Sequence, residues 1–311
     1  MKPGVVLKYA FGMRIGMGLD GGGTKTDCML MGDGGRVLGR GRGGASNPSR
    51  IGVEAAARGV KEVAAAALQN AGLQMAQVKD VCAGLAGVAA AERAAAMREL
   101  LSRFFVGARF ELCTDLDLAL GAAGTRAAIV LVAGTGSAAI GRNEAGKVAR
   151  SGGYGPKKSD EGSAFAVGKS AVSEIARAAN EEAENLRARI SELLGVDSFE
   201  KFAGLEDAEA DEVYPRVFPV VAKAADEESE IARKLLREAA ENLAGFVAGV
   251  QQELDLSGTK FTLAKTGGMI GRSKYFDETL DAELRRVAPR AKLETLETPL
   301  VEVAARRALS L

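Results

Sequence analysis

Apolar residues alternate with glycines and polar residues in three short runs between residues 14 and 44. The runs are "RIGMGLD", "TDCMLMG" and "RVLGRGRGG", and a two-residue alternation of this kind is typical of strands. Asp33, Gly34 and Gly35 separate the second run from the third and supply the positive-φ positions that a tight hairpin needs. The pattern therefore predicts a three-stranded meander whose last two strands are antiparallel.

Helical and strand-like spacing then follow one another along the rest of the chain. The first set is a helix at 53–72, a strand at 80–87, a helix at 89–104, a strand at 108–115 and a helix from Leu116. A second set has strands at 127–134, 137–143 and 147–153, mainly helices over 163–254, a strand at 260–265, a helix from Ser273, a short run at 291–296 and a helix from residue 300. We interpret the acidic segment "GLEDAEADE" at 204–212 as a solvated loop.

The two sets share one layout. "DGGGTKTDCMLMGDGGRVLGRG" and "VAGTGSAAIGRNEAGKVARSG" both read as a strand, a Gly/Thr turn, a strand, an acidic-Gly turn and a strand. An internal duplication explains this pattern. The sequence predicts an α/β protein built from two βββαβαβα lobes, with one Gly/Thr hairpin in each.

Composition and charge narrow the number of domains and the kinds of partner to be expected. With 311 residues and 47% hydrophobic residues, two domains are expected. Forty-one Lys plus Arg balance 41 Asp plus Glu, so no global field recruits nucleic acid or an anionic membrane. No run reaches the roughly 18 apolar residues of a membrane span, and the opening segment lacks the pattern of an export signal. We therefore expect a soluble, cytoplasmic protein.

The chain contains no histidine, which removes histidine bases, Ser-His-Asp triads and the usual zinc sites. Proton transfer would fall to a carboxylate or, less often, to Lys, Tyr or Cys. Cys28, Cys82 and Cys113 lie far apart in strand-like runs, so we expect reduced core residues.

The stretch "GMGLDGGGTKTD" matches G-x-G-x-x-G and nearly spells a P-loop. Both motifs require a helix directly afterwards, whereas here a strand follows. What remains is a hairpin in which Gly22, Gly23, Thr24 and Lys25 approach phosphate oxygens and Asp20 orients a hydrated Mg²⁺. A plain glycine hairpin is the structural alternative.

Two further glycine loops follow strands. "AGTGSAA" contains Gly134, Thr135, Gly136 and Ser137, and it repeats the first hairpin in the second lobe. "TGGMIG", at 266–271, leads into a helix, and its backbone can pack against adenosine, although strand-Gly-Gly-helix is also a common structural joint.

With these three loops in this order, the chain resembles the actin, Hsp70 and sugar-kinase superfamily. It is most similar to the N-acetylglucosamine kinase-like branch of the BadF/BadG/BcrA/BcrD ATPase family. The motifs that carry the resemblance are "GLDGGGTKT", "SN" at 46–47, "CTD" ending at Asp115, "LVAGTGS", "SDEGSAFAVG" and "TGGMI". The resemblance implies a two-lobed actin-like (ribonuclease H-like) ATPase fold with an interlobe cleft. Its N-terminal lobe would comprise residues 1–117 plus 299–311, and its C-terminal lobe 118–298.

The resemblance also implies roles for individual residues. Asp115 matches the general base that takes a proton from a sugar hydroxyl. Asn47, Gly87, Asp115 and Asp160 match sugar contacts, while Gly267, Gly268 and Met269 match the adenosine loop. The structural alternatives are that "TD" caps a helix, that Asn47 before Pro48 is turn chemistry and that "SDEGSAF" is an N-cap. Asp117 is the neighbouring carboxylate against which Asp115 must be tested.

The implied activity is phosphorylation of an amino sugar with Mg-ATP as cofactor, at the 6-hydroxyl. N-acetylglucosamine is the first expected substrate, with glucosamine and N-acetylmuramate as alternatives. Lys157 and Lys158 beside Asp160 are either solvated lysines or a cationic rim that favours an anionic sugar. An ATPase that activates another enzyme and a non-catalytic sugar-binding regulator are the more remote alternatives. The sequence leaves open whether the protein forms a homodimer.

Overall fold

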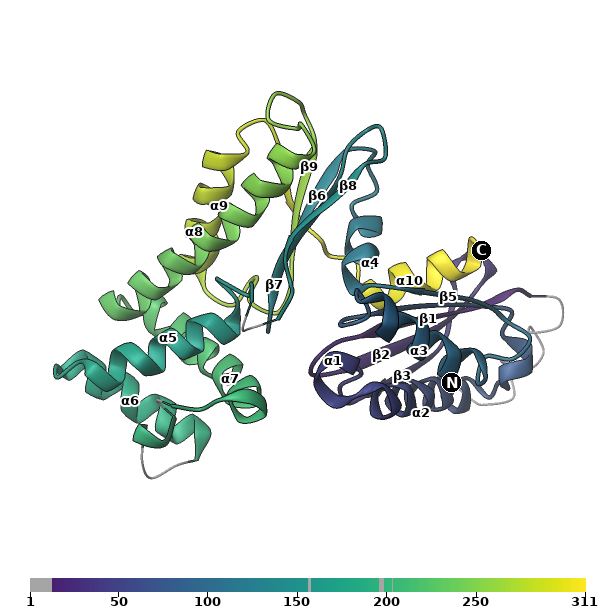
Figure 1. The fold of residues 1–311 in the computed structure, drawn as a ribbon, viewed down its shortest axis with the longest axis horizontal. Coiled ribbons are helices and arrows are strands. Elements are labelled where there is room, and N and C mark those ends of the chain that lie inside the picture. Colours follow the sequence, from purple (N-terminus) through teal and green to yellow (C-terminus); the bar gives the residue numbers. More distant parts are fainter. Residues whose placement is uncertain (1–12, 156–157, 196–198, 203) are drawn as a thin grey trace. The chain divides into compact units, whose positions relative to one another are not determined.

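The computed structural model describes residues 13–155, 158–195, 199–202 and 204–311, and these residues form two compact units (Figure 1). Unit 1 contains residues 13–122 and 298–311, and unit 2 contains the described residues of 123–297. The lobe boundary expected at 117/118 falls inside a helix, α4 (Asp115–Ala122), which belongs wholly to unit 1. The opening segment before Met13 and the residue Lys157 lie outside the described residues.

Unit 1 is built on a five-stranded sheet with the order β3-β2-β1-β4-β5. Its strands are β1 (Ile15–Gly21), β2 (Thr26–Gly32), β3 (Val37–Gly43), β4 (Asp80–Leu85) and β5 (Arg109–Cys113). The first three are antiparallel neighbours, as predicted, and β1, β4 and β5 run parallel. Gly34 and Gly35 have φ values of 78° and 81°, so the predicted positive-φ turn is present.

Helices cover both faces of this sheet (Figure 1). They are α1 (Pro48–Ile51), α2 (Val53–Ala71), α3 (Ala91–Ser102), α4 and α10 (Leu300–Leu309). α2 packs on β2 and β3, and α10 packs on β1 and β4 from the other face. A Cβ at Gly18 would lie 2.6 Å from the Val301 carbonyl oxygen of α10, so this glycine permits close helix packing. The G-x-G-x-x-G pattern at this position is therefore a packing feature of a strand.

Unit 2 repeats the same sheet, with the order β10-β9-β6-β7-β8. Its strands are β6 (Ala128–Ala133), β7 (Ser137–Arg142), β8 (Val148–Gly152), β9 (Thr262–Thr266) and β10 (Lys292–Thr295). β6, β7 and β8 are antiparallel, while β6, β9 and β10 are parallel. The two sheets thus match strand for strand, which confirms the duplicated layout.

The helices of unit 2 are α5 (Ala164–Arg177), α6 (Glu181–Leu194), α7 (Asp207–Asp226), α8 (Glu230–Glu253) and α9 (Lys274–Val287). α8 packs on β6, β7 and β8, and Leu236, Leu243 and Val247 on this helix are fully buried. No helix among the described residues is long and apolar enough to cross a membrane.

The prediction of an acidic loop at 204–212 is wrong over 207–212, because α7 begins at Asp207. Acidic residues are favourable in the first turn of a helix, where the macrodipole is positive. Ala210 and Tyr214 are four residues apart and both are buried, so helical spacing already starts inside the acidic stretch.

Candidate functional site

The first Gly/Thr hairpin joins β1 to β2, and its turn is closed by a hydrogen bond from the Gly22 amide to the Lys25 carbonyl at 2.9 Å. Thr24 and Lys25 are exposed at the tip. Lys25 Nζ lies 3.0 Å from Asp27 Oδ2, and Arg42 Nε lies 2.6 Å from Asp27 Oδ1. The Lys25 ammonium group therefore has an anchor that holds it beside the glycine turn.

Asp20, the second-last residue of β1, pairs with Gly84 of β4, and Gly84 pairs with Cys113 of β5, two residues before Asp115. Burial, and next the charge of Asp115, raise the pKa of Asp20 to about 7. Two adjacent carboxylates in a half-buried place favour a cation between them. Mg²⁺ is commonly held by one or two carboxylates together with substrate phosphates and water, and this pair fits that donor set. No group of three or more His, Cys, Asp or Glu residues that could hold a metal ion is present among the described residues.

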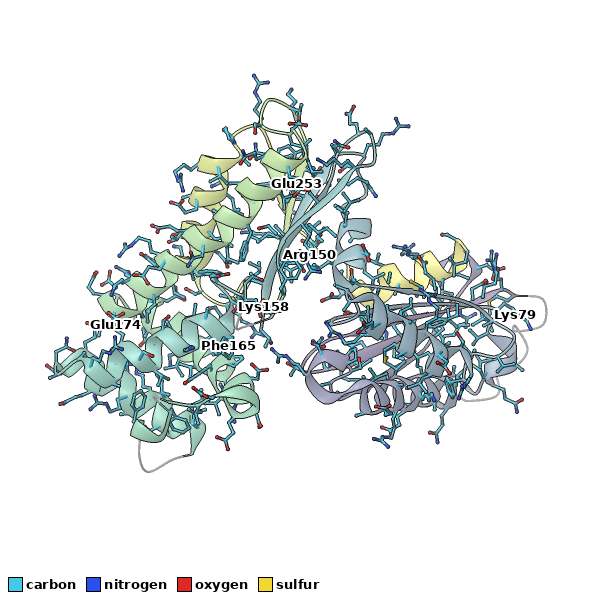
Figure 2. The ribbon with its side chains drawn as sticks, viewed as in Figure 1. Lys79, Arg150, Lys158, Phe165, Glu174 and Glu253 are labelled. Carbon is cyan, nitrogen blue, oxygen red and sulfur yellow. The ribbon has the colours of Figure 1, made fainter. Side chains whose placement is uncertain are left out.

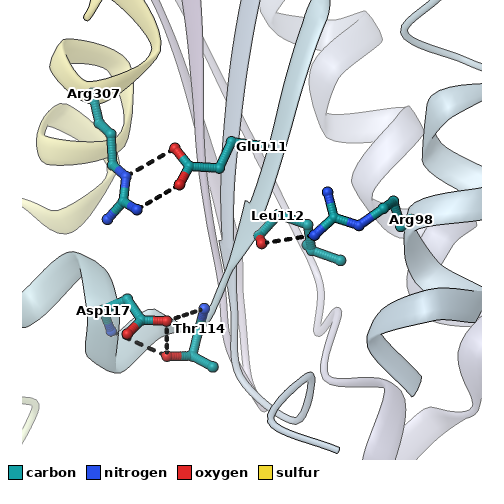
Figure 3. Close-up of polar contacts among 6 residues, drawn as sticks. All are labelled: Arg98, Glu111, Leu112, Thr114, Asp117 and Arg307. Carbon is teal, nitrogen blue, oxygen red and sulfur yellow. Dashed lines mark hydrogen bonds and ion pairs between the residues drawn. The ribbon is translucent and has the colours of Figure 1, made fainter. Parts of the chain in front are cut away.

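Asp115 is the first residue of α4 and follows β5 after one residue. Figure 3 shows how β5 is held before this point: Arg307 of α10 binds Glu111 through two nitrogens, with Nε at 2.9 Å from Oε2, and Arg98 of α3 donates to the Leu112 carbonyl at 3.3 Å. Helices on both faces of the sheet therefore hold the strand that delivers Asp115.

The helix cap beside Asp115 is formed by its neighbours (Figure 3). The Thr114 amide and hydroxyl donate to Asp117 Oδ2 at 2.9 and 2.7 Å, and Thr114 Oγ1 accepts from the Asp117 amide at 3.1 Å. This is a reciprocal capping arrangement. Asp117 therefore has a structural role, and the capping alternative raised for "TD" applies to Thr114 and Asp117.

Asn47 and Gly87, both predicted sugar contacts, lie against each other. Gly87 has a φ of 83°, and a Cβ there would collide with Asn47 Oδ1. Asn47 caps α1: its Oδ1 accepts from the Ser49 amide at 2.9 Å and from the Ser49 hydroxyl at 2.6 Å. The cap uses the side-chain oxygen only, so the Nδ2 donors remain suited to a hydroxyl of a ligand.

The second hairpin, between β6 and β7, packs against the Asp160 side chain. A Cβ at Gly136 would lie 2.9 Å from Asp160 Oδ2, and Asp160 is buried. The Ala164 amide donates to the Gly134 carbonyl at 2.9 Å, and the Phe165 amide donates to the Thr135 carbonyl at 3.3 Å. The start of α5 is thus fastened to the hairpin, with Ser163 as its N-cap.

The predicted adenosine loop adjoins the same hairpin. The Met269 amide donates to the Ala133 carbonyl at 3.0 Å, and a Cβ at Gly134 would lie 3.6 Å from the Gly268 nitrogen. Gly267 has a φ of 116° and packs directly on the Ala133 backbone. Met269 as a whole residue is 1% exposed and belongs to the core of unit 2, whereas Gly267 and Gly268 are exposed, so the two glycines are the part of this loop that a nucleotide could contact.

A cavity of about 190 Å³ adjoins Asp160 in unit 2. It is lined by Lys158, Ser159, Asp160, Glu161, Phe165, Ala166, Lys169 and Ser170. Figure 2 shows the labelled Lys158 and Phe165 at this part of unit 2. The sequence does not single out Lys169, because whether this residue lines the cavity depends on which face of α5 is turned toward it.

Arg50 is a second residue that the sequence did not single out. A Cβ at Gly23 would lie 3.1 Å from Arg50 Nη1 and 3.3 Å from Arg50 Cζ, so the guanidinium group lies against the first hairpin. The signal available in the sequence was only its position three residues after Asn47, within α1.

The three cysteines are free, as predicted, with Cys28 and Cys82 buried and Cys113 half-buried. A hydrogen bond with Cys82, and then burial, raise the pKa of Cys113, which keeps this thiol protonated. The cysteines lie on β2, β4 and β5, all of which belong to unit 1.

Two matching α/β units, each with a Gly/Thr hairpin at the end of its first strand, define a two-lobed kinase-type ATPase fold. A solved structure of a proposed N-acetylglucosamine kinase from Chromobacterium violaceum has this fold, with a TM-score of 0.75 and 25% identity, covering 94% of this chain and 98% of that one. The predicted fold class is therefore confirmed.

The chain belongs to the BadF/BadG/BcrA/BcrD ATPase family, whose model matches residues 17–304. An N-acetylmuramic acid/N-acetylglucosamine kinase from Clostridium acetobutylicum is 26% identical over 290 residues, which cover 92% of this chain and 95% of that protein. An N-acetyl-D-glucosamine kinase from Dictyostelium discoideum is 24% identical over 295 residues, which cover 90% and 92%. These matches confirm the predicted family and the predicted enzyme class, a phosphotransferase of the sugar-kinase type.

Proposed function

We propose that the protein uses Mg-ATP to phosphorylate an amino sugar, with N-acetylglucosamine as its first substrate and N-acetylglucosamine 6-phosphate as the product. The observation that carries the proposal is that Asp20 and Asp115 stand at strand ends of one sheet, beside the first glycine hairpin, where the charge of Asp115 acts on the pKa of Asp20. Asp20 can bind the metal ion through water, while Asp115 can accept the proton of the sugar hydroxyl. The identity of the relatives as amino-sugar kinases supports the substrate class.

In unit 1, Gly22, Gly23, Thr24 and Lys25 would hold phosphate oxygens, and Asp20 would hold Mg²⁺ through water. Bound Mg²⁺ neutralises the charge that develops on the phosphates. Asp115 accepts the proton of the sugar hydroxyl as that oxygen attacks the γ-phosphorus and ADP leaves. A carboxylate is suited to this step because it can act as a general base, and the chain has no histidine that could do so.

Recognition of the sugar would use the Nδ2 donors of Asn47 and the carboxylate of Asp160. Gly87 keeps room for Asn47, because a Cβ there would displace the amide. In unit 2, the hairpin of Gly134, Thr135, Gly136 and Ser137 would hold phosphate oxygens, although the Gly134 amide itself closes the turn by donating to the Gly136 carbonyl at 2.9 Å. The exposed backbone at Gly267 and Gly268 would contact adenosine, with Met269 anchoring the loop in the core.

The experiment is a coupled ADP-release assay with N-acetylglucosamine, glucosamine and N-acetylmuramate, each with Mg-ATP. We expect turnover with at least one amino sugar, strongest with N-acetylglucosamine, and no release of ADP when sugar is omitted. Release of ADP that is independent of every sugar would overturn the proposal and favour an ATPase that drives another protein. Identification of the product as the 6-phosphate by NMR completes the test.

A further inference from the structure

Thr26 and Ser137 occupy the same position in the two duplicated sheets. Thr26 begins β2 and pairs with Gly21, the last residue of β1. Ser137 begins β7 and pairs with Ala133, the last residue of β6. Each is therefore the first residue after the turn of a predicted phosphate hairpin, and each carries a hydroxyl.

Both residues are removed from solvent, since Thr26 is 0% exposed and Ser137 is 3% exposed. A buried hydroxyl needs a partner, because burial without a hydrogen bond costs free energy. The hydrogen-bond partner of each hydroxyl therefore indicates the role of Thr26 and of Ser137.

In unit 1, Thr26 Oγ1 lies 2.7 Å from the Gly44 carbonyl oxygen and 2.7 Å from Ser46 Oγ. A hydroxyl has one proton and a carbonyl oxygen only accepts, so Thr26 donates to Gly44 and Ser46 donates to Thr26. Ser46 is fully buried, and its amide donates to the Gly22 carbonyl at 3.0 Å. The segment that leads directly into Asn47 is thus tied to the first hairpin at both of its edges.

In unit 2, Ser137 Oγ donates to the Glu161 carbonyl at 2.7 Å. Glu161 directly follows Asp160, whose carboxylate lies against Gly136 of the same hairpin. The single proton of Ser137 is committed to this bond, so its hydroxyl cannot at the same time donate to a phosphate. The side chain faces the loop that carries Asp160.

We propose that Thr26 and Ser137 are equivalent positioning residues, each of which holds a sugar-binding loop, the one bearing Asn47 or the one bearing Asp160, in register with the phosphate hairpin of its own unit. The inference rests on the proposed function for its reading of Asn47 and Asp160. Duplication then explains both hydroxyls at once: each unit couples one phosphate hairpin to one sugar contact through one buried side chain.

The first test compares kinetic constants in Thr26→Val and Ser137→Ala, which remove the hydroxyl with little change of shape. We expect the KM for the sugar to rise about three- to tenfold, the worth of roughly one hydrogen bond, and the KM for ATP to change by less than about twofold. Thr26→Ser and Ser137→Thr keep a hydroxyl and should restore the sugar KM. An effect on the ATP KM alone, or an unchanged sugar KM, would overturn the proposal.

Ser229→Ala is the matched control, because Ser229 caps α8 and bonds Glu182 far along the chain from either hairpin. It should lower thermal stability without changing the sugar KM. A similar rise of the sugar KM in this variant would show that the effect comes from general destabilisation, which contradicts a positioning role.

Hydrogen–deuterium exchange provides a readout that does not require turnover. Thr26→Val should speed exchange of the amides of 44–47, and Ser137→Ala should speed exchange of those of 159–164, each without affecting the other segment. Unchanged exchange in both segments would refute the inference. If the parent protein phosphorylates no amino sugar, the proposed function fails, and the exchange data alone decide whether the two hydroxyls hold these loops.

Discussion

The carboxylates of Asp20 and Asp115 come together in unit 1 although 95 positions separate them in the chain, and the charge of Asp115 contributes to the raised pKa of Asp20. They meet because β1, β4 and β5 are parallel neighbours, so their carboxyl ends lie at one edge of the sheet. In the α/β class this edge is where ligands bind.

The first prediction concerns pH and Asp20. Its folded pKa, about 7, lies above the ordinary value of 3.8, so the folded state binds the proton more tightly than the unfolded state. Its contribution to stability is therefore largest at low pH and is lost as pH rises from about 4 to about 7. Asp20→Asn should come closest to the parent near pH 4, exceed it increasingly as pH rises to about 7, and exceed it near pH 8 by a free energy of unfolding on the order of a few kcal/mol, measured by urea titration without Mg-ATP.

The same substitution should abolish ATP-dependent turnover, since the amide cannot replace a carboxylate toward Mg²⁺. Saturating Mg-ATP should stabilise the parent most above pH 7, where Asp20 is ionised, and should stabilise Asp20→Asn little. Parallel stability curves for the two proteins from pH 5 to pH 8 would show that Asp20 does not titrate as described.

The second prediction separates Asp115 from Asp117 by two isosteric changes that each remove one charge. If Asp115 is the general base, as proposed, Asp115→Asn should lower kcat by about 10²- to 10⁴-fold with little change in sugar affinity. Asp117→Asn should keep kcat within severalfold and cost at most about 1 kcal/mol of stability, because the amide oxygen can still accept from Thr114. Steady-state kinetics and thermal unfolding measure both. Equal loss of kcat in the two variants would contradict the assignment of the base.

Much of this site follows from local patterns. The hairpin at Gly22–Lys25 and its repeat at Gly134–Ser137 are predictable, because turn residues and alternation lie within a few positions of each other. The strand ahead of Asp115 is recognisable for the same reason. The start of α7 does not follow from composition, because the acidic residues of 204–212 indicate a loop while the helical spacing of Ala210 and Tyr214 indicates a helix.

Other parts depend on tertiary packing that no local pattern records. Arg50 comes to the first hairpin only because α1 follows β3 at a particular angle, and Lys169 joins the cavity near Asp160 only through the rotation of α5. The capping role of Asp117 likewise depends on tertiary structure, because it is the Asp117 carboxylate that accepts from Thr114.

The third prediction concerns Arg50, whose guanidinium group lies against Gly23. A hydrogen bond to a charged group contributes about 1.5–3 kcal/mol, so Arg50→Gln should raise the KM for ATP by about tenfold or more. The sugar KM should change less. Arg58→Gln, on the exposed face of α2, removes the same charge elsewhere in unit 1 and serves as the control. An unchanged ATP KM in Arg50→Gln would remove Arg50 from the phosphate site.

The last prediction concerns the cavity beside Asp160, where Lys158 and Lys169 stand with the carboxylates of Asp160 and Glu161. The lysines balance the two acids, so removing them leaves a net negative lining. Lys158→Gln with Lys169→Gln should lower kcat/KM for N-acetylmuramate relative to N-acetylglucosamine by about three- to tenfold. The same double variant should raise relative activity on glucosamine, whose ammonium group is cationic.

Raising the salt concentration checks whether this effect is electrostatic, because the Debye screening length is about 8 Å at physiological ionic strength and shortens as salt is added. The difference between parent and double variant on N-acetylmuramate should therefore shrink as salt is raised. Lys274→Gln, an exposed lysine of α9, controls for loss of charge alone. If the preference among the three sugars is the same in parent and double variant, these lysines are solvated surface residues, and the proposed sugar contacts of unit 1, Asn47 and Gly87, become the residues to test for the choice of substrate.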